Sequence, residues 1–147
     1  MINDILISVV APVYNEEQCI KDYVEQTIKV LDNNYLNYEL ILVDDGSQDN
    51  TIKIVEKMLR EIRNIRLISL SRNYGREVAM SAGLDSSIGD YVVIMDSDLQ
   101  DSPHVIPKLI NKAIEGYDVV YASRTIRKGE SFLKKCSPNN FIRLYLI

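Results

Sequence analysis

The sequence is poor in residues that mark several common protein classes. Its 147 residues include no tryptophan, two phenylalanines, one histidine and two cysteines. Cys19 and Cys136 lie far apart and match no metal-binding or redox spacing, so we interpret both as thiols of a reducing compartment. His104 has no second histidine to act with, and we assign it no catalytic role.

Several functional signatures are also absent. No G-x-G-x-x-G follows the first apolar segment, which argues against a nicotinamide cofactor, and the chain has no P-loop and no G-x-S-x-G elbow. No apolar run reaches the roughly 18–20 residues that a membrane helix needs. The first ten residues lack a basic flank and a small-residue cleavage site, so we expect no signal peptide.

The charge of the chain is unevenly distributed around a net value of −4. Residues 124–147 hold six basic side chains and one acid, a net charge of +5, which leaves −9 for residues 1–123. We therefore expect a core domain over 1–123 and a basic segment over 124–147. A solvated loop would explain such a segment, and a surface for anionic lipid or phosphate is the alternative.

Apolar segments and helical periodicities alternate along the chain. Strands are predicted at 5–12, 38–43, 65–70, 90–95 and 118–122, and helices at 52–62, 76–87 and 104–115. A further helix follows Asn15, which we interpret as an N-cap with Gln18 closing a capping box. This alternation predicts an α/β fold with a mostly parallel sheet and helices on both faces.

The segment VVIMDSDLQD, residues 92–101, runs from a predicted strand directly into three carboxylates. Asp96 and Asp98 are two residues apart, so in an extended segment they point to the same side. Two such carboxylates repel each other unless a cation binds them or one takes a proton. With the neutral amide of Gln100 nearby, these hard oxygen ligands suit Mg²⁺ or Mn²⁺, whose shell substrate phosphates would complete.

Polar residues also follow the other predicted strands, at the edge where α/β sheets bind ligands. Asp44 and Asp45 could accept hydrogen bonds from ribose hydroxyls or from the N–H groups of uracil or guanine, and turn capping is the alternative. For Asp49 we favour helix capping. Arg72 and Arg76 could contact a pyrophosphate or pair with the nearby acids.

Taken together, the segments PVYNEE, DDGSQDNT, SRNYGREVAMSAGL, MDSDLQDSP and DVVYASRTIRKGES resemble the family 2 inverting glycosyltransferases. They are similar in particular to the polyprenyl-phosphate branch, which includes dolichol-phosphate mannose synthases and undecaprenyl-phosphate glucosyltransferases. The resemblance implies a three-layer, Rossmann-like GT-A fold. It also implies truncation at the C-terminus, because the family continues with further strands and, in this branch, with amphipathic and membrane helices.

The resemblance implies roles for single residues. The nucleotide pocket would be lined by Pro12, Tyr14 and Glu16. Base and ribose would meet Val43 and Asp45. The diphosphate would be held through Mg²⁺ or Mn²⁺ by Asp96, Ser97 and Asp98, with Gln100 assisting. Arg124 would reach the phosphates, and Arg127 would help to place an acceptor phosphate.

The implied reaction moves a sugar from a UDP- or GDP-linked donor to an acceptor with inversion. A polyprenyl phosphate at the cytoplasmic face of the membrane is the leading acceptor. Its oxygen is already anionic, which lessens the need for a general base, although Asp101 beside the catalytic Asp98 is a candidate.

Two other functions remain open, namely transfer to a surface polysaccharide and a non-catalytic sugar-nucleotide-binding fragment. We expect no nucleic-acid partner. A nucleotidyltransferase would need a glycine-rich basic loop after the first strand, which PVYNEE lacks.

Overall fold

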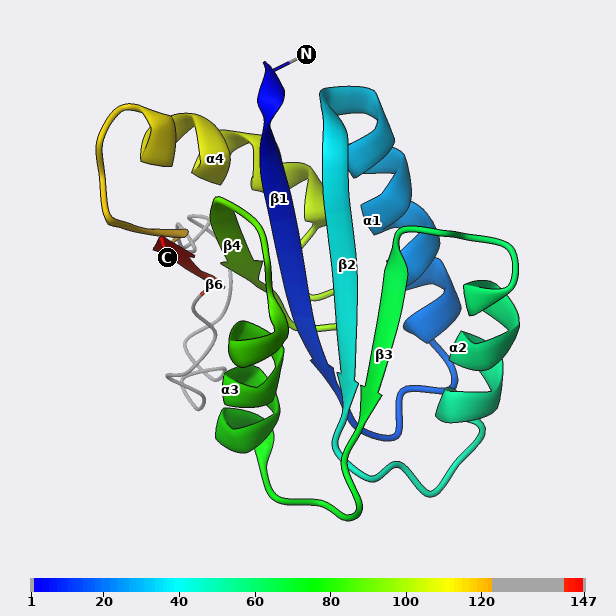
Figure 1. Ribbon diagram of the computed structural model, residues 1–147. Coiled ribbons are helices and arrows are strands. Elements are labelled where there is room, and N and C mark those ends of the chain that lie inside the picture. The colour runs from blue at the N-terminus through cyan, green and yellow to red at the C-terminus, as the bar shows by residue number, and fades with distance from the viewer. Residues whose placement is uncertain (1, 123–141, 147) are drawn as a thin grey trace, which may run out of the picture.

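The structure is a computed structural model that describes residues 2–122 and 142–146. In this part of the chain six strands form one sheet, in the order β3-β2-β1-β4-β6-β5 (Figure 1). The elements in chain order are β1 (Ile2–Val13), α1 (Ile20–Asn34), β2 (Tyr35–Asp44), α2 (Thr51–Leu59), β3 (Ile65–Ser69), α3 (Arg76–Ser86), β4 (Tyr91–Ile94), the 3₁₀ turn η1 (Pro103–Val105), α4 (Ile106–Ile114), β5 (Val119–Ala122) and β6 (Ile142–Leu146).

The sheet is mostly parallel, as the alternation of predicted strands and helices indicates. β1 pairs in parallel with both β2 and β4, and β2 pairs in parallel with β3. The predicted strand at 118–122 is present as β5, but it lies at the edge of the sheet. β6 separates it from β4 and pairs antiparallel to both of these strands. The sheet therefore has a parallel body and an antiparallel edge.

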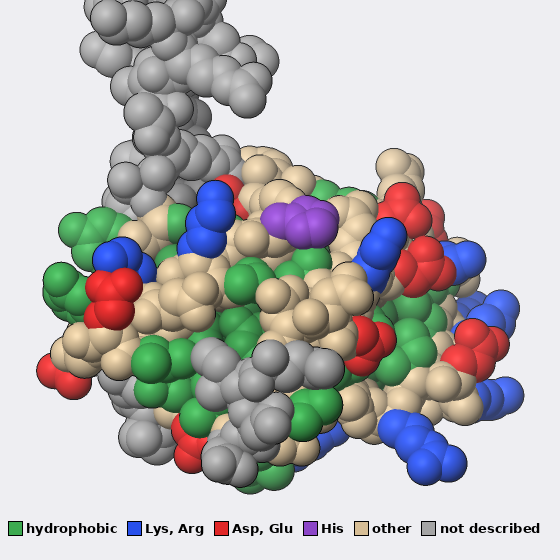
Figure 2. Space-filling model, turned by 90° about the horizontal axis from the view of Figure 1, so that it is seen from above, with side chains coloured by type: hydrophobic (Ala, Val, Ile, Leu, Met, Phe, Trp, Pro, Cys, Tyr) green, Lys and Arg blue, Asp and Glu red, His purple; other side chains and the backbone are tan. Residues whose placement is uncertain are grey.

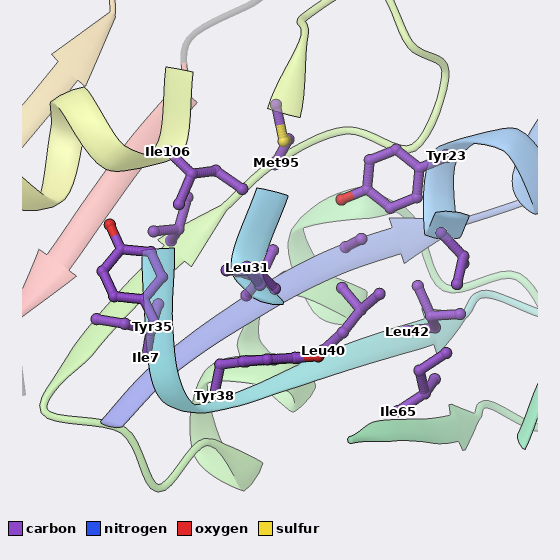
Figure 3. Close-up of a cluster of buried hydrophobic side chains, with 14 of the residues drawn as sticks. Ile7, Tyr23, Leu31, Tyr35, Tyr38, Leu40, Leu42, Ile65, Met95 and Ile106 are labelled. Atoms are coloured by element: carbon purple, nitrogen blue, oxygen red, sulfur yellow. The ribbon is translucent and has the colours of Figure 1, made fainter. Parts of the chain in front are cut away.

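Helices cover both faces of the sheet, because the side chains of each strand alternate between the two faces. Ile7 and Val9 of β1 join the larger buried cluster, which includes side chains of α1, α2 and α4 (Figure 3). Val10 points to the other face and packs with Ala79 and Met80 of α3. The two clusters fix the layers of an α/β sandwich and hold the carboxyl ends of the strands in place.

The first helix begins later than predicted. α1 starts at Ile20 with Cys19 at its N-cap, and no side chain caps it. Asn15 adopts a left-handed conformation with φ of 54°, and its Oδ1 accepts a hydrogen bond from the backbone N–H of Gln48 at 2.8 Å. The predicted capping box of Asn15 and Gln18 is therefore wrong, because the asparagine amide holds the loop after β2 instead.

Asp49 has the structural role predicted for it. Its Oδ1 accepts a hydrogen bond from the N–H of Thr51, the first residue of α2, at 2.9 Å. Its Oδ2 accepts from the N–H of Glu17 at 3.1 Å. These bonds connect the loop after β1, through Asp49 in the loop after β2, to the start of α2.

Candidate functional site

The carboxyl ends of the parallel strands meet at one edge of the sheet, the lower edge in Figure 1. The loops that follow β1, β2, β3 and β4 surround a cavity of about 350 Å³. This is the edge at which α/β sheets bind ligands. The cavity is lined by Pro12, Val13, Tyr14, Glu16, Asp45, Asn73, Gly75, Arg76, Asp96, Ser97 and Asp98.

The loop after β4 carries the acids of the cavity. One nitrogen of Arg76, Nη2, lies 2.8 Å from Oδ1 and 2.9 Å from Oδ2 of Asp96. Asp98 Oδ1 accepts a hydrogen bond from the N–H of Gln100 at 3.0 Å. Burial raises the pKa of Asp96, and the charges of Asp98 and Asp101 add to this, whereas Arg76 opposes it. The cavity thus holds carboxylates whose negative charge a bound cation would relieve.

Ser97 lies between the two acids and anchors their loop. Its side chain is buried, and its Oγ donates a hydrogen bond to the carbonyl of Pro12 in β1 at 3.1 Å. Its own carbonyl accepts a long bond from the Cys19 thiol, at 3.7 Å. The hydroxyl of Ser97 is therefore engaged with β1, which positions Asp96 and Asp98 on either side of it.

The two predicted acids after β2 have different surroundings. Asp44 is buried and accepts hydrogen bonds from the N–H groups of Gly46 and Ser47, each at 3.1 Å, and it does not line the cavity. Asp45 lines the cavity, and its two oxygens accept from the N–H groups of Tyr74 at 2.7 Å and Gly75 at 2.9 Å. The turn-capping alternative thus describes Asp44, and Asp45 anchors the loop that leads into α3.

Gly46 is required by the close approach of two loops. A Cβ at this position would lie 2.5 Å from the backbone carbonyl carbon of Arg72, and the φ of +74° is left-handed. The guanidinium of Arg72 lies over the ring of Tyr74, 4.7 Å from its centroid. Of the two arginines considered for phosphate or acid contacts, Arg76 is the one that the structure brings to the cavity.

Tyr14 and Glu16 form the wall after β1. Tyr14 is largely exposed, and Glu16 Oε2 accepts a hydrogen bond from the Cys19 thiol at 2.8 Å. Burial raises the pKa of Cys19 to about 12, and the bond to Glu16 and its charge add to the effect. The thiol therefore stays protonated at neutral pH and is a poor nucleophile.

Some predicted residues lie away from the cavity lining. Val43 is fully buried in the cluster beneath α3. Gln100 and Asp101 belong to the loop of the acids but do not line the cavity. Arg124 and Arg127 lie outside the described residues. His104 is exposed on the face shown in Figure 2, among side chains of both charges, and does not line the cavity either.

Three lining residues have no role in the sequence-based prediction: Val13, Asn73 and Gly75. Asn73 and Gly75 stand between two arginines in the loop after β3, and that pattern was the available signal. Gly75 has a φ of +100° and is the N-cap of α3. No sequence pattern indicated that Asp45 would fix this glycine and so bring Asn73 to the cavity.

A divalent cation such as Mg²⁺ requires several oxygen ligands. Among residues 2–122 and 142–146, no group of three or more histidine, cysteine or acidic side chains is placed to hold a metal. Mg²⁺ and similar hard cations commonly use only one or two protein carboxylates together with substrate phosphates and water. Asp96 and Asp98 fit a cation of this kind, one that a diphosphate shares, and do not fit a cation held by protein alone.

The chain is an α/β domain with an acidic cavity at the carboxyl edge of its sheet. The chain belongs to glycosyl transferase family 2, since the model of that family matches residues 8–145. This confirms the resemblance noted in the sequence. It makes the chain a glycosyltransferase domain with the GT-A fold.

Comparison with known proteins supports this assignment. The chain is 46% identical over 132 residues to the undecaprenyl-phosphate 4-deoxy-4-formamido-L-arabinose transferase of Proteus mirabilis (strain HI4320), over 89% of this chain and 40% of that protein. It spans 40 to 43% of the length of the curated relatives that it matches. In the part that the structure describes, no helix is both long and apolar enough to cross a bilayer.

Two solved structures show the same fold. One is the mannosyltransferase PcManGT from Pyrobaculum calidifontis in complex with GDP-Man and Mn²⁺, with 26% identity and a TM-score of 0.59 over 64% of this chain and 28% of that chain. The other is glucosyl-3-phosphoglycerate synthase from Mycobacterium tuberculosis in complex with Mn²⁺, UDP and phosphoglyceric acid. It has 27% identity and a TM-score of 0.62 over 80% of this chain and 42% of that chain.

Proposed function

We propose that the chain is the donor-binding part of a glycosyltransferase that moves a sugar from a UDP- or GDP-linked donor to a polyprenyl phosphate, with inversion and with the help of Mg²⁺ or Mn²⁺. The observation that carries the proposal is the acidic cavity at the carboxyl ends of β1, β2 and β4. In it Asp96 pairs with Arg76, and Asp98 lines the same cavity. This set of charges suits a cation and the diphosphate that it accompanies.

The lining residues suggest how the donor is held. We propose that Tyr14 and Asp45 contact the base and ribose of the donor and that Glu16 lines the same part of the cavity. Asp96 and Asp98 would hold a divalent cation, which stabilises negative charge on a leaving diphosphate when it is bound. Ser97 belongs to the same lining. Val43, Asp44 and Gln100 would then support the site from behind the lining, and Arg124 would complete the phosphate contacts.

The acceptor side needs little acid–base chemistry if the acceptor is a phosphate. Its oxygen is anionic and can attack the anomeric carbon directly while the nucleoside diphosphate leaves. Asp101, three residues beyond Asp98, is the proposed base if the acceptor carries a hydroxyl. The reaction would thus depend mainly on positioning and charge.

Two facts support a lipid acceptor. The Proteus mirabilis relative is named for an undecaprenyl-phosphate substrate. Residues 124–147 carry a net charge of +5, which suits an anionic lipid surface. We therefore propose that the full-length protein works at the cytoplasmic face of the membrane and that Arg127 helps to place the acceptor phosphate.

A binding role without transfer is the second candidate. Such a role needs only the donor cavity, whose lining lies entirely within the described residues. Transfer to a surface polysaccharide would use the same donor site and differ only in the acceptor.

Calorimetric titration with UDP, GDP and their sugar conjugates, with and without Mn²⁺, tests the donor site. We expect one nucleotide to bind in a metal-dependent way, and we expect Asp98→Ala to abolish that dependence. Binding that ignores both the metal and Asp98 would contradict the assignment of the acids. A parallel assay of sugar transfer to undecaprenyl phosphate separates the acceptors, because transfer to polysaccharide alone would exclude the lipid.

A further inference from the structure

The contact between Arg76 and Asp96 has a consequence for how the site takes up its ligands. The guanidinium nitrogen Nη2 lies within 2.9 Å of both carboxylate oxygens. Arg76 is the first residue of α3, and Asp96 lies in the loop after β4. Among the described residues, Arg76 is the only arginine or lysine in the cavity lining.

A divalent cation and this guanidinium compete for the same oxygens. A Mg²⁺ ion would lie about 2.0–2.1 Å from a carboxylate oxygen. Both Asp96 oxygens already face Arg76, so a cation bound to either of them would be placed close to a positive charge. The repulsion between the two is strong in a partly buried site. Cation binding therefore requires the guanidinium to leave Asp96.

A diphosphate provides the new partner that the guanidinium would need. Arginine binds phosphate oxygens through paired hydrogen bonds as well as it binds carboxylates. The backbone before Arg76 is anchored, because Asp45 accepts hydrogen bonds from the N–H groups of Tyr74 and Gly75. The exchange of partners is therefore a side-chain rotation that leaves the loop in place.

We propose that Arg76 is a built-in counter-ion that occupies Asp96 until a divalent cation and a nucleoside diphosphate bind together. This inference rests on the proposed function, since it assumes the same donor site. It makes Arg76 a positioning residue with two partners, Asp96 before binding and a phosphate afterwards. Its consequence is positive coupling: the cation alone binds weakly, and each ligand strengthens the binding of the other.

The test is a set of titrations of the chain with Mn²⁺ alone, with UDP or GDP alone, and with both, on the wild type and on Arg76→Gln. The concentration of bound Mn²⁺ is measured from the loss of the electron paramagnetic resonance signal of the free ion. We expect R76Q to bind Mn²⁺ alone about three- to tenfold more tightly, because the competing cation is gone. We expect the same variant to bind the nucleoside diphosphate more weakly and to lose most of the coupling.

Arg72→Gln is the matched control. It removes the same charge from the loop that leads to Arg76, but Arg72 lies over Tyr74 and outside the cavity lining. Its affinity for Mn²⁺ should stay within about twofold of the wild type, which separates a specific contact from a general change of charge. An R76Q affinity for Mn²⁺ that is unchanged or weaker than that of the wild type overturns the proposal.

Two other outcomes also decide between the proposals. If R76Q does not fold, the Arg76 guanidinium resonance of the wild type serves instead. It should shift when Mg²⁺ and a nucleoside diphosphate are added together, and an unmoved resonance at saturation overturns the proposal. If neither UDP nor GDP binds the wild type with Mn²⁺, the proposed function fails, while the effect of R76Q on Mn²⁺ alone still decides the role of Arg76.

Discussion

The buried carboxylate Glu39 and the acids after β4 lie toward opposite ends of the same sheet and have opposite surroundings. Glu39 of β2 lies at the end where β3 and β4 begin, and its side chain is nearly buried. It accepts hydrogen bonds from Ser8 Oγ at 2.6 Å, from Arg66 Nη1 at 2.7 Å and from the N–H of Ile88 at 3.0 Å. Ser8 Oγ in turn accepts from the N–H of Gly89 at 2.9 Å. Each of the three donors to this carboxylate stabilises its charge.

The consequence appears in the ionisation of Glu39. Burial opposes its charge, but the hydrogen bonds from Ser8, Arg66 and Ile88 outweigh burial and hold the pKa of Glu39 below its usual value. A carboxylate that the fold satisfies in this way contributes to stability whenever it is ionised.

The cluster at the carboxyl ends is the reverse case. Burial raises the pKa of Asp96, and the neighbouring acids Asp98 and Asp101 raise it further. Here the fold gathers like charges and supplies one arginine to offset them. A structural acid such as Glu39 is stabilised by hydrogen-bond donors of the protein itself. A binding acid such as Asp96 has other acids close to it, and a bound cation would stabilise its negative charge.

The largest loss of stability is expected when Glu39 is removed. Glu39→Ala removes the acceptor of the Ser8 hydroxyl and of the Ile88 N–H, and it leaves Arg66 with the Ser86 carbonyl but no carboxylate. The free energy of unfolding should therefore fall by about 2–3 kcal/mol. Because the pKa is lowered in the folded state, this contribution is complete above pH about 4.5 and is lost as the pH falls. Urea unfolding at neutral and acidic pH should therefore show the difference between wild type and variant shrinking on acidification. A constant difference would mean that the charge is irrelevant.

A smaller loss is expected at Gly89, which lies against β1. A Cβ there would lie 2.6 Å from both N and Oγ of Ser8 and 2.9 Å from the carbonyl oxygen of Leu6. Gly89→Ala should lower the free energy of unfolding by about 1–3 kcal/mol, because backbone must move to make room. The exposed neighbour Ile88 gives the control, since Ile88→Ala keeps its N–H donor and should change stability by less than about 0.5 kcal/mol. Equal losses of stability in Gly89→Ala and Ile88→Ala would contradict the claim that the backbone of β1 leaves no room for a side chain at Gly89.

Asp45 lies at the binding end of the sheet, yet both of its carboxylate oxygens accept hydrogen bonds from backbone N–H groups. Asp45→Ala removes the acceptor of the Tyr74 and Gly75 N–H groups and should cost about 1–2 kcal/mol. Hydrogen exchange should accelerate at these two amides, and nucleotide affinity should fall with it. Unchanged exchange at both amides would show that the bonds do not hold the loop.

The smallest effect on stability is expected at Asp98, and it should have the opposite sign. Asp98→Asn relieves repulsion with Asp96, so the ligand-free chain should gain a few tenths of a kcal/mol. Metal-dependent nucleotide binding should be lost in the same variant. Asp85→Asn removes an equal charge from an exposed position and controls for net charge. A loss of stability in D98N beyond that control would place Asp98 with the structural acids.

Much of the fold could be predicted from sequence, because burial on both faces of a parallel strand leaves a continuous apolar run. The strands around Val9, Ile41 and Val93 are of this kind and were predicted close to their bounds. The placement of β5 could not be predicted, because it depends on β6 entering the sheet between β4 and β5. That pairing joins segments distant in sequence, which local periodicity does not encode.

The candidate site was predictable to a similar extent. Asp96 and Asp98 were found because i and i+2 spacing after a strand is a local signal. The different roles of Asp44 and Asp45 could not be predicted, because they depend on which backbone N–H groups the loop after β3 brings to Asp45. The Glu39 cluster was missed for the same reason, since its donors come from three separate segments.

Thermal unfolding with and without ligands tests whether Asp96 and Asp98 form a ligand site, in contrast to the structural acid Glu39. A ligand present at 100 times its dissociation constant adds about 2.7 kcal/mol, which corresponds to roughly 5–10 °C in Tm for a chain of this size. We predict a rise of this order when Mn²⁺ is added with UDP or GDP, a much smaller rise with either component alone, and none in Asp98→Asn. No shift with any combination, or the same shift in the variant, would contradict the claim that the acids at the carboxyl ends of the strands form a ligand site.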